Sequence, residues 1–303
     1  MDAACVDRRS GARGPLIGAG AVARSLAVPS PPEAPTTRLS RLVVSRAPVA
    51  KTVFITGASS GIGRALAIEF ARRGHDLFLT ARRLDALERV RTDTATADPA
   101  RRVEVRRLDV TDAGDVASAL AEGAEKLGRI DIVVANAGIG NSGRVGEGNV
   151  ERARLIVETD LIGAIATTDA AVALFRRQGG SGQVVGVSSV AGVRGLPGSA
   201  SYSASKAGLT VYLESVRAET SAEPITVTTL APGYIDTPIN QDVKSRPFLI
   251  YAERGARIMA DLIERGVGYA TVPRFPWTVL APLMRVLPTS LLVRGAPQRE
   301  SAA

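Results

Sequence analysis

The sequence predicts an α/β fold, a single doubly wound domain with a mainly parallel sheet of about seven strands. Apolar runs of strand length alternate along the chain with amphipathic stretches of helix length. A glycine-rich turn separates the first run from the first stretch, and no internal repeat is visible. With 303 residues, of which 45% are hydrophobic, the chain can bury the core that such a domain needs.

Seven short apolar runs, rich in β-branched residues, are the expected strands. They lie at residues 51–56, 76–81, 103–108, 130–135, 183–187, 225–230 and about 270–272. Helical patterns occupy the intervals, among others at residues 61–73, 112–127, 150–177 and 203–220. Because strands and helices alternate, we expect a parallel sheet with helices on both faces.

The two ends of the chain differ from this body. Residues 1–50 have seven Arg against three acidic residues, and residues 265–303 have five Arg against one, so residues 51–264 are neutral. A neutral body argues against nucleic-acid binding. We expect a disordered basic extension at 1–50, the catalytic domain at 51–272 and an apolar, basic segment at 273–303. A targeting leader and a secretory signal are two further interpretations of the first fifty residues.

The glycine-rich turn follows the first expected strand and precedes the first expected helix. Gly57 permits a tight turn, Gly61 lets the backbone approach a pyrophosphate, and Gly63 lets helix and strand pack closely. The amino end of the helix then offers free N–H groups and a positive dipole end. We therefore predict a Rossmann-type dinucleotide site. Its turn residues are Gly57, Ser59, Ser60, Gly61, Ile62 and Gly63.

The turn has the spacing Thr-Gly-x3-Gly-x-Gly, which resembles the short-chain dehydrogenase/reductase family, and the resemblance extends over about residues 51–250. Further family motifs follow in order: an Asp after the third strand, Asn-Ala-Gly after the fourth, and Pro-Gly-x3-Thr near the nicotinamide. Ala135 stands where the family usually has a further Asn. The resemblance implies cofactor contacts from these motifs, at Asp109, Val110, Asn136, Ala137, Gly138, Pro232, Gly233, Ile235 and Thr237.

The end of the second expected strand bears on the choice of nicotinamide cofactor. Enzymes that select NAD usually have an acidic residue there, which binds the ribose 2′-hydroxyl. Here Ala81 is followed by Arg82 and Arg83, and a guanidinium can pair with a 2′-phosphate. We predict NADPH rather than NADH, with Arg82 as the first choice for the phosphate partner and Arg83 as the second.

Tyr202 and Lys206 are four residues apart on an expected helix and therefore share one face. A nearby ammonium lowers the pKa of a phenol, which suits proton exchange with a carbonyl or alcohol oxygen. Ser189 follows an apolar strand, where its hydroxyl can hold the same oxygen. The three match the family's Ser and Tyr-x3-Lys motifs, with Ser188 as the alternative serine. We also expect Tyr202 and Lys206 to contact the cofactor, Lys206 through the nicotinamide ribose.

One position departs from the family pattern. The family has an Asn within Asn-x2-Gly that helps hold a water in the proton relay to the Lys, and this chain has Asp160 followed by Leu161, Ile162 and Gly163. Asp160 keeps the backbone carbonyl and a side-chain acceptor, but it lacks the amide donor and can add a charge. We expect a working relay with altered pH dependence, and we count Asp160 as a member of the catalytic site.

The last segment carries an apolar stripe at near-helical spacing. The stripe consists of Trp277, Leu280, Leu283, Met284 and Leu287, with several arginines nearby and prolines at 276, 282 and 288. It is too interrupted to span a bilayer, which takes about 18 consecutive apolar residues. We expect it to close the substrate pocket or to pack on another protomer, with an interfacial membrane anchor as the alternative. Both interpretations favour a lipophilic small-molecule substrate.

The leading functional hypothesis is an NADPH-dependent oxidoreductase, a carbonyl reductase or alcohol dehydrogenase. The alternatives are a catalytically silent NADPH-binding module and an epimerase or dehydratase on the same scaffold. The single cysteine, Cys5, and the single histidine, His75, exclude a Cys-based or His-rich metal centre, and we expect no metal. We expect a cytoplasmic homodimer or homotetramer, as the family often forms, with peripheral membrane association as the alternative.

Overall fold

The computed structural model describes residues 50–140, 143–243 and 245–290. The first 49 residues, where we predicted a basic extension, and residues 291–303 of the C-terminal segment lie outside this description. The described residues belong to one compact unit.

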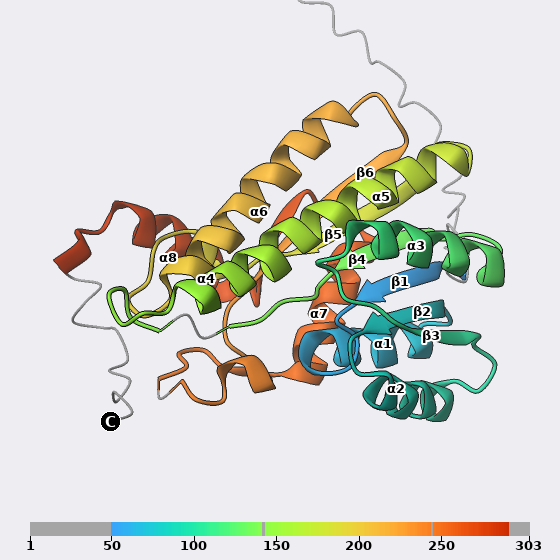
Figure 1. Cartoon of the computed structure of the whole chain (residues 1–303), viewed down its shortest axis with the longest axis horizontal. Coiled ribbons are helices and arrows are strands. Elements are labelled where there is room, and N and C mark those ends of the chain that lie inside the picture. The colour runs from blue at the N-terminus through green and yellow to red at the C-terminus, as the bar shows by residue number, and fades with distance from the viewer. Residues whose placement is uncertain (1–49, 141–142, 244, 291–303) are drawn as a thin grey trace, which may run out of the picture. The chain divides into compact units, whose positions relative to one another are not determined.

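All strands of the main sheet run parallel to their neighbours, in the order β3-β2-β1-β4-β5-β6-β9 (Figure 1). The strands are β1 (Thr52–Thr56), β2 (Asp76–Ala81), β3 (Val103–Arg107), β4 (Ile132–Ala135), β5 (Gly182–Val187), β6 (Ile225–Pro232) and β9 (Tyr269–Val272). The predicted class and the predicted seven-stranded sheet are confirmed. The predicted strand ends lie within two residues of the observed ones, and those of β2 match.

Helices cover both faces of this sheet (Figure 1). On one face α1 (Gly61–Arg72) contacts both α2 (Leu84–Ala97) and α7 (Ala252–Glu264). On the other face α5 (Gly163–Arg177) contacts both α3 (Ala113–Leu127) and α6 (Ala200–Glu219). The apolar side chains of each helix layer pack against one face of the sheet and form a separate buried cluster there.

The buried strand β1 shows why its sequence is a continuous apolar run. Its side chains alternate between two covered faces, so every residue is buried. Val53 and Ile55 join the cluster beneath α1 and α7. Phe54 points to the other face and stacks on Phe78, with ring centroids 5.4 Å apart. Truncating a buried phenylalanine of this kind to alanine costs about 3–5 kcal/mol.

The order of the strands reverses between β1 and β4, which are neighbours although β2 and β3 come between them in sequence. In open α/β sheets, the carboxyl ends of the strands at such a reversal border a ligand-binding crevice. The glycine-rich turn follows β1, and Asn136 to Gly138 follow β4. The topology therefore brings these two predicted cofactor segments to one edge of the sheet.

The helical stretch predicted over residues 150–177 has the predicted ends, but it contains a π-helical turn that the sequence pattern did not predict. α4 (Val150–Val157) passes into a π-helical turn (Glu158–Ile162), and α5 begins at Gly163. Such turns insert an extra residue into a helix and occur often at functional sites. Here the turn contains the fully buried Asp160. α5 then lies so close to Val110 that a Cβ at Gly163 would be 2.6 Å from the Val110 side chain.

The C-terminal part of the chain adds a helix beside β9 (Figure 1). In the loop after β6, β7 (Ile235–Asp236) pairs with β8 (Ile250–Tyr251). α8 (Arg274–Val286) continues through Pro282, although Phe275 near its start has non-helical backbone angles. Pro276 lies in the first turn, where the missing N–H needs no partner. None of the helices within the described ranges is long and apolar enough to cross a membrane.

Candidate active site

The glycine-rich turn is packed too closely to accept side chains. Gly57 and Gly61 have φ of +67° and +55°, a region that side chains disfavour. A Cβ at Gly57 would lie 2.7 Å from the Ala137 Cα, and one at Gly63 would lie 2.5 Å from the Gly57 carbonyl oxygen. The turn therefore presents bare backbone before α1, which fits a pyrophosphate. The remaining predicted turn residues, Ser59, Ser60 and Ile62, are half-buried.

Thr56, at the end of β1, joins this turn to the segment after β4. Its hydroxyl accepts hydrogen bonds from the backbone N–H groups of Asn136 and Ala137, both at 3.0 Å. The Asn136 side-chain amide donates to the Thr56 carbonyl at 2.9 Å. These bonds hold the two predicted cofactor segments against each other. Gly138 follows, and a Cβ there would be 3.0 Å from a carboxylate oxygen of Asp160.

Asp109 and Val110 lie just beyond β3, at the same carboxyl edge of the sheet. The Asp109 carboxylate accepts hydrogen bonds from the backbone N–H and the hydroxyl of Thr111, at 3.1 and 2.9 Å. Val110 is buried beneath Gly163. The Asp109 side chain is thus oriented by its own loop.

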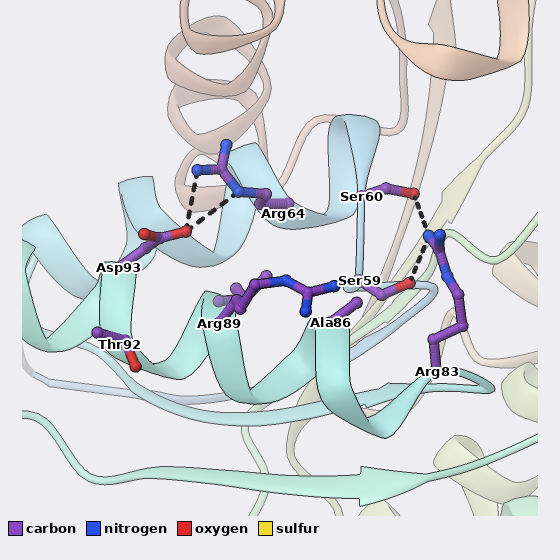
Figure 2. Close-up of a pocket in the computed structure, with 9 residues that line it drawn as sticks. Ser59, Ser60, Arg64, Arg83, Ala86, Arg89, Thr92 and Asp93 are labelled. Carbon is purple, nitrogen blue, oxygen red and sulfur yellow. Dashed lines mark hydrogen bonds and ion pairs between the residues drawn. The ribbon is translucent and has the colours of Figure 1, made fainter.

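Of the two arginines after β2, Arg83 is the one that contacts the glycine-rich turn. Its guanidinium donates to the hydroxyls of Ser59 and Ser60, each at 3.3 Å (Figure 2). Arg82, our first choice from the sequence, is exposed, as Arg83 is, but it forms no hydrogen bond with the turn in the part of the chain that the structure describes. The hydrogen bonds therefore favour Arg83 over Arg82 as the arginine that lies at the turn.

Two more arginines border the same place, and sequence reasoning missed both. A cavity of about 560 Å³ lies between the turn and α2, and Arg83, Arg64 and Arg89 line it (Figure 2). Arg64 also pairs with Asp93 at 2.9 Å. The available signal was positional, because Arg64 directly follows the glycine motif.

The three predicted catalytic side chains meet at the carboxyl end of β5. Ser189 follows β5, and its hydroxyl donates to the Pro232 carbonyl at 3.4 Å. Tyr202, from the first turns of α6, forms a hydrogen bond with Ser189. The Lys206 ammonium lies 5.7 Å from the centre of the Tyr202 ring and donates to the Val187 carbonyl at 3.1 Å.

The alternative serine, Ser188, has a different environment. It is buried, and its hydroxyl donates to the Lys206 carbonyl at 2.9 Å and lies 2.7 Å from the Thr210 hydroxyl. The Ser188 hydroxyl is thus hydrogen-bonded to residues of α6. Ser189 is the serine that forms a hydrogen bond with Tyr202.

Asp160 and Lys206 form a buried ion pair, with Oδ2 and Nζ 3.2 Å apart. The other carboxylate oxygen of Asp160 accepts the Ile139 N–H at 2.7 Å. Burial opposes the charge of Lys206, but the negative charges of Asp160 and of an ionised Tyr202 outweigh it, so the pKa of Lys206 is above its ordinary value. Lys206 therefore remains an ammonium.

The pKa of Tyr202 is raised, not lowered as we expected from the nearby ammonium, because burial is the largest cause. The Lys206 ammonium and the hydrogen bond with Ser189 lower it in part, whereas the Asp160 charge raises it further. Burial also raises the pKa of Asp160, against the Lys206 ammonium and the Ile139 N–H. Tyr202 is thus held as a phenol that can donate a proton.

The Pro-Gly segment ends β6 beside Ser189. After it, Ile235 is buried, and its carbonyl accepts hydrogen bonds from the Thr237 hydroxyl at 3.1 Å and from the Asn240 amide at 2.8 Å. Asn240 is a contact that the motif does not reveal. The segment from Pro232 to Thr237 thus borders the same edge of the sheet as the glycine-rich turn, and Thr237 lies 3.4 Å from where a Cβ of Gly61 would be.

Comparison with known proteins bears on the family to which the chain belongs. The family model of short chain dehydrogenases matches residues 51–247. A Mycobacterium tuberculosis protein described as an uncharacterized oxidoreductase is 41% identical over 245 residues, which are 80% of this chain and 96% of that protein. A Myxococcus xanthus protein described in the same words is 37% identical over 250 residues, with coverages of 81% and 96%.

The structure of an alcohol dehydrogenase from the archaeon Thermococcus sibiricus, complexed with 5-hydroxy-NADP, has a TM-score of 0.66 and 28% identity to this chain. The match covers 73% of this chain and 95% of that one. The chain therefore belongs to the short-chain dehydrogenase/reductase family and is an NAD(P)-dependent oxidoreductase.

Proposed function

We propose that this protein is an NADPH-dependent carbonyl reductase or alcohol dehydrogenase that acts on a lipophilic substrate. The observation that carries the proposal is the convergence of Ser189, Tyr202 and Lys206 at the end of β5, with Tyr202 bonded to Ser189 and Lys206 beneath its ring. A module that only binds the cofactor has no need for these three groups together.

The role of each side chain follows from its chemistry. Nicotinamide cofactors supply the hydride when bound, at the segment from Pro232 to Thr237. In the reductive direction Ser189 donates a hydrogen bond to the substrate carbonyl oxygen, and Tyr202 delivers the proton that this oxygen needs. The Lys206 ammonium stabilises the phenolate that remains on Tyr202, and the phenol is restored by a proton from solvent. In the oxidative direction the same proton transfers run in reverse.

The preference for NADPH over NADH rests on the basic cavity beside the glycine-rich turn. We propose that Arg83 binds the 2′-phosphate, because Arg64 and Arg89, which line the same cavity, are paired with Asp93 and Asp85. Arg82 remains the competing candidate from the sequence. The similar archaeal alcohol dehydrogenase, which is complexed with a form of NADP, supports the proposal by analogy.

The lipophilic character of the substrate is inferred from α8 and the loop before it. Phe248 and Trp277 make an edge-to-face contact, with ring centroids 5.7 Å apart. Trp277 in turn lies against Gly233, within the predicted nicotinamide segment. Aromatic side chains therefore border the end of the site at which the substrate binds.

To test the activity, NADPH oxidation is followed with aldehydes and ketones graded from small and polar to long-chain and polycyclic. Tyr202→Phe serves as the matched control, because it removes only the acidic hydroxyl. We expect turnover of the lipophilic members by the wild-type protein and its near-complete loss in Tyr202→Phe. Tight NADPH binding without turnover across the panel would instead favour the binding module.

We further propose that the enzyme is a cytoplasmic homodimer or homotetramer that also makes peripheral contact with membranes through α8. The outer face of this helix exposes apolar residues and is flanked by Arg274 and Arg285. We expect co-sedimentation with anionic vesicles to fall in Val279→Asp/Leu283→Asp but not in Val145→Asp, which changes an exposed loop valine. Equal recovery of the three proteins would exclude the membrane contact, and light scattering would give the oligomeric state.

A further inference from the structure

The inner face of α8 packs on the segment that follows β6. Trp277 is 5% exposed, whereas Val279 and Val286 on the outer face are 62% and 77% exposed. The indole occupies the space where residue 233 would have a side chain: a Cβ at Gly233 would be 2.2 Å from Nε1 and 2.5 Å from Cε2. The Trp277 indole can therefore pack here only because residue 233 is a glycine.

The other end of α8 is held by Arg194. This guanidinium donates to the carbonyls of Met284 at 2.8 Å, Arg285 at 3.1 Å and Leu287, and to the Thr289 hydroxyl at 3.1 Å. The last carbonyls of a helix have no partners within it and lie at the negative end of its dipole, so a bound guanidinium satisfies and stabilises them.

These two attachment points border the catalytic serine. Arg194 belongs to the loop that begins at Ser189, and Gly233 directly follows Pro232, whose carbonyl accepts the Ser189 hydroxyl. α8 therefore bridges the segment that carries the serine and the segment expected to hold the nicotinamide. A shift of either segment changes the distance between the hydride donor and the groups that hold the carbonyl oxygen.

We propose that α8 is a positioning element of the active site, in which Arg194 and Trp277 fix the Pro232–Gly233 segment relative to Ser189. The inference rests on the proposed oxidoreductase function. Both residues act through the segments that they hold, and a misplacement of about 1 Å in such a segment can cost about a hundredfold in rate.

The chain provides its own reporter for this contact, because Trp277 is its only tryptophan. We compare Arg194→Met, which removes the cap of α8, with Arg194→Lys, which keeps a charge. The control is Arg177→Met, an exposed arginine in the last turn of α5. Tryptophan emission, its change on adding NADP⁺, and kcat at saturating substrate are measured for each folded protein.

In Arg194→Met we expect emission at longer wavelength, loss of the NADP⁺-induced change, and a kcat reduced by about tenfold or more. We expect the KM for NADPH to change less than kcat, partial rescue in Arg194→Lys, and wild-type behaviour in Arg177→Met. The proposal is overturned if Arg194→Met matches Arg177→Met in emission and in its response to NADP⁺. This comparison remains valid even if the wild-type protein reduces no carbonyl in the panel, a result that would count against the proposed function alone.

A second pair of variants covers the case in which Arg194→Met does not fold. Gly233→Ala places a methyl group where the Trp277 indole lies, so the two clash. The double variant Gly233→Ala/Trp277→Leu removes the indole and with it the clash. We expect the single variant to lose kcat and the double variant to recover part of it, a non-additivity that coupled neighbours show. Trp277→Leu alone completes the cycle, and a double variant whose loss equals the sum of the two single losses would contradict the proposal.

Discussion

The carboxylate of Asp160 lies 3.2 Å from the ammonium of Lys206, and both side chains are buried. An asparagine at this position would leave the ammonium without a negative partner. The pair therefore changes the electrostatics around Tyr202, because each of its two charges acts on the phenol with opposite sign.

The first prediction concerns the pH dependence of Asp160→Asn. Reduction needs the Tyr202 phenol, so its rate is highest below the pKa of Tyr202 and falls as the pH rises through it. Removing the Asp160 charge lowers that pKa, because this charge disfavours the phenolate. In pH–rate profiles of Asp160→Asn we expect the decline of reduction, and the rise of alcohol oxidation, at lower pH than in the wild-type protein. Superimposable profiles would show that the ion pair does not tune Tyr202.

The second prediction separates the two arginines after β2. Arg83 donates hydrogen bonds to Ser59 and Ser60 beside the basic cavity, whereas Arg82, which is also exposed, forms no hydrogen bond with the turn in the described part of the chain. A charge-assisted hydrogen bond contributes about 1.5–3 kcal/mol, so we expect Arg83→Ala to lower kcat/KM for NADPH by about tenfold or more. Arg82→Ala should have a smaller effect, and NADH kinetics should change little in both. The reverse order of the two variants would restore Arg82 as the phosphate partner.

The third prediction concerns stability at acidic pH. His75 is buried, and its Nδ1 accepts the Lys51 N–H at 3.0 Å, so the ring must be neutral at that nitrogen. Burial lowers the pKa of His75 below its usual value of 6.5, and the unfolded chain therefore binds the proton more tightly. The stability from a neutral His75 is complete above pH 6.5 and is lost as the pH falls below it.

Thermal unfolding measured at mildly alkaline and mildly acidic pH tests the role of His75. We expect the wild-type protein to lose more stability on acidification than His75→Gln, because the glutamine side chain at position 75 does not titrate. An equal loss in the two proteins would assign the acid sensitivity to other residues.

Local patterns in the sequence were sufficient for the strands and the glycine-rich turn. The continuous apolar run of β1 follows from burial on both faces, and the glycine positions follow from contacts among residues 57–63 and with Ala137. By contrast, the contact of Arg83 with the turn depends on the path of the chain after β2. Two adjacent arginines in a sequence do not specify which of them makes such a contact.

Two other features depend on contacts between distant parts of the chain. The π-helical turn around Asp160 retains an apolar pattern close to that of an α-helix, so periodicity alone predicted one continuous helix. The cap that Arg194 places on α8 joins residues about ninety positions apart, and an isolated arginine in a loop gives no sign of it. The apolar stripe around Trp277 was visible in the sequence, but the structure divides it, because Trp277 is buried against Gly233 whereas Leu283 is exposed.

The central claim is that the protein transfers hydride from NADPH to a carbonyl carbon, and isotopic labelling tests it most directly. NADPH that carries deuterium at the transferable position is incubated with the protein and a lipophilic ketone, and the product is analysed by mass spectrometry. We predict one deuterium on the carbinol carbon of the alcohol, formed by the wild-type protein and not by Tyr202→Phe. A product without deuterium, or one formed with no consumption of NADPH, would contradict the claim and point to epimerase or dehydratase chemistry.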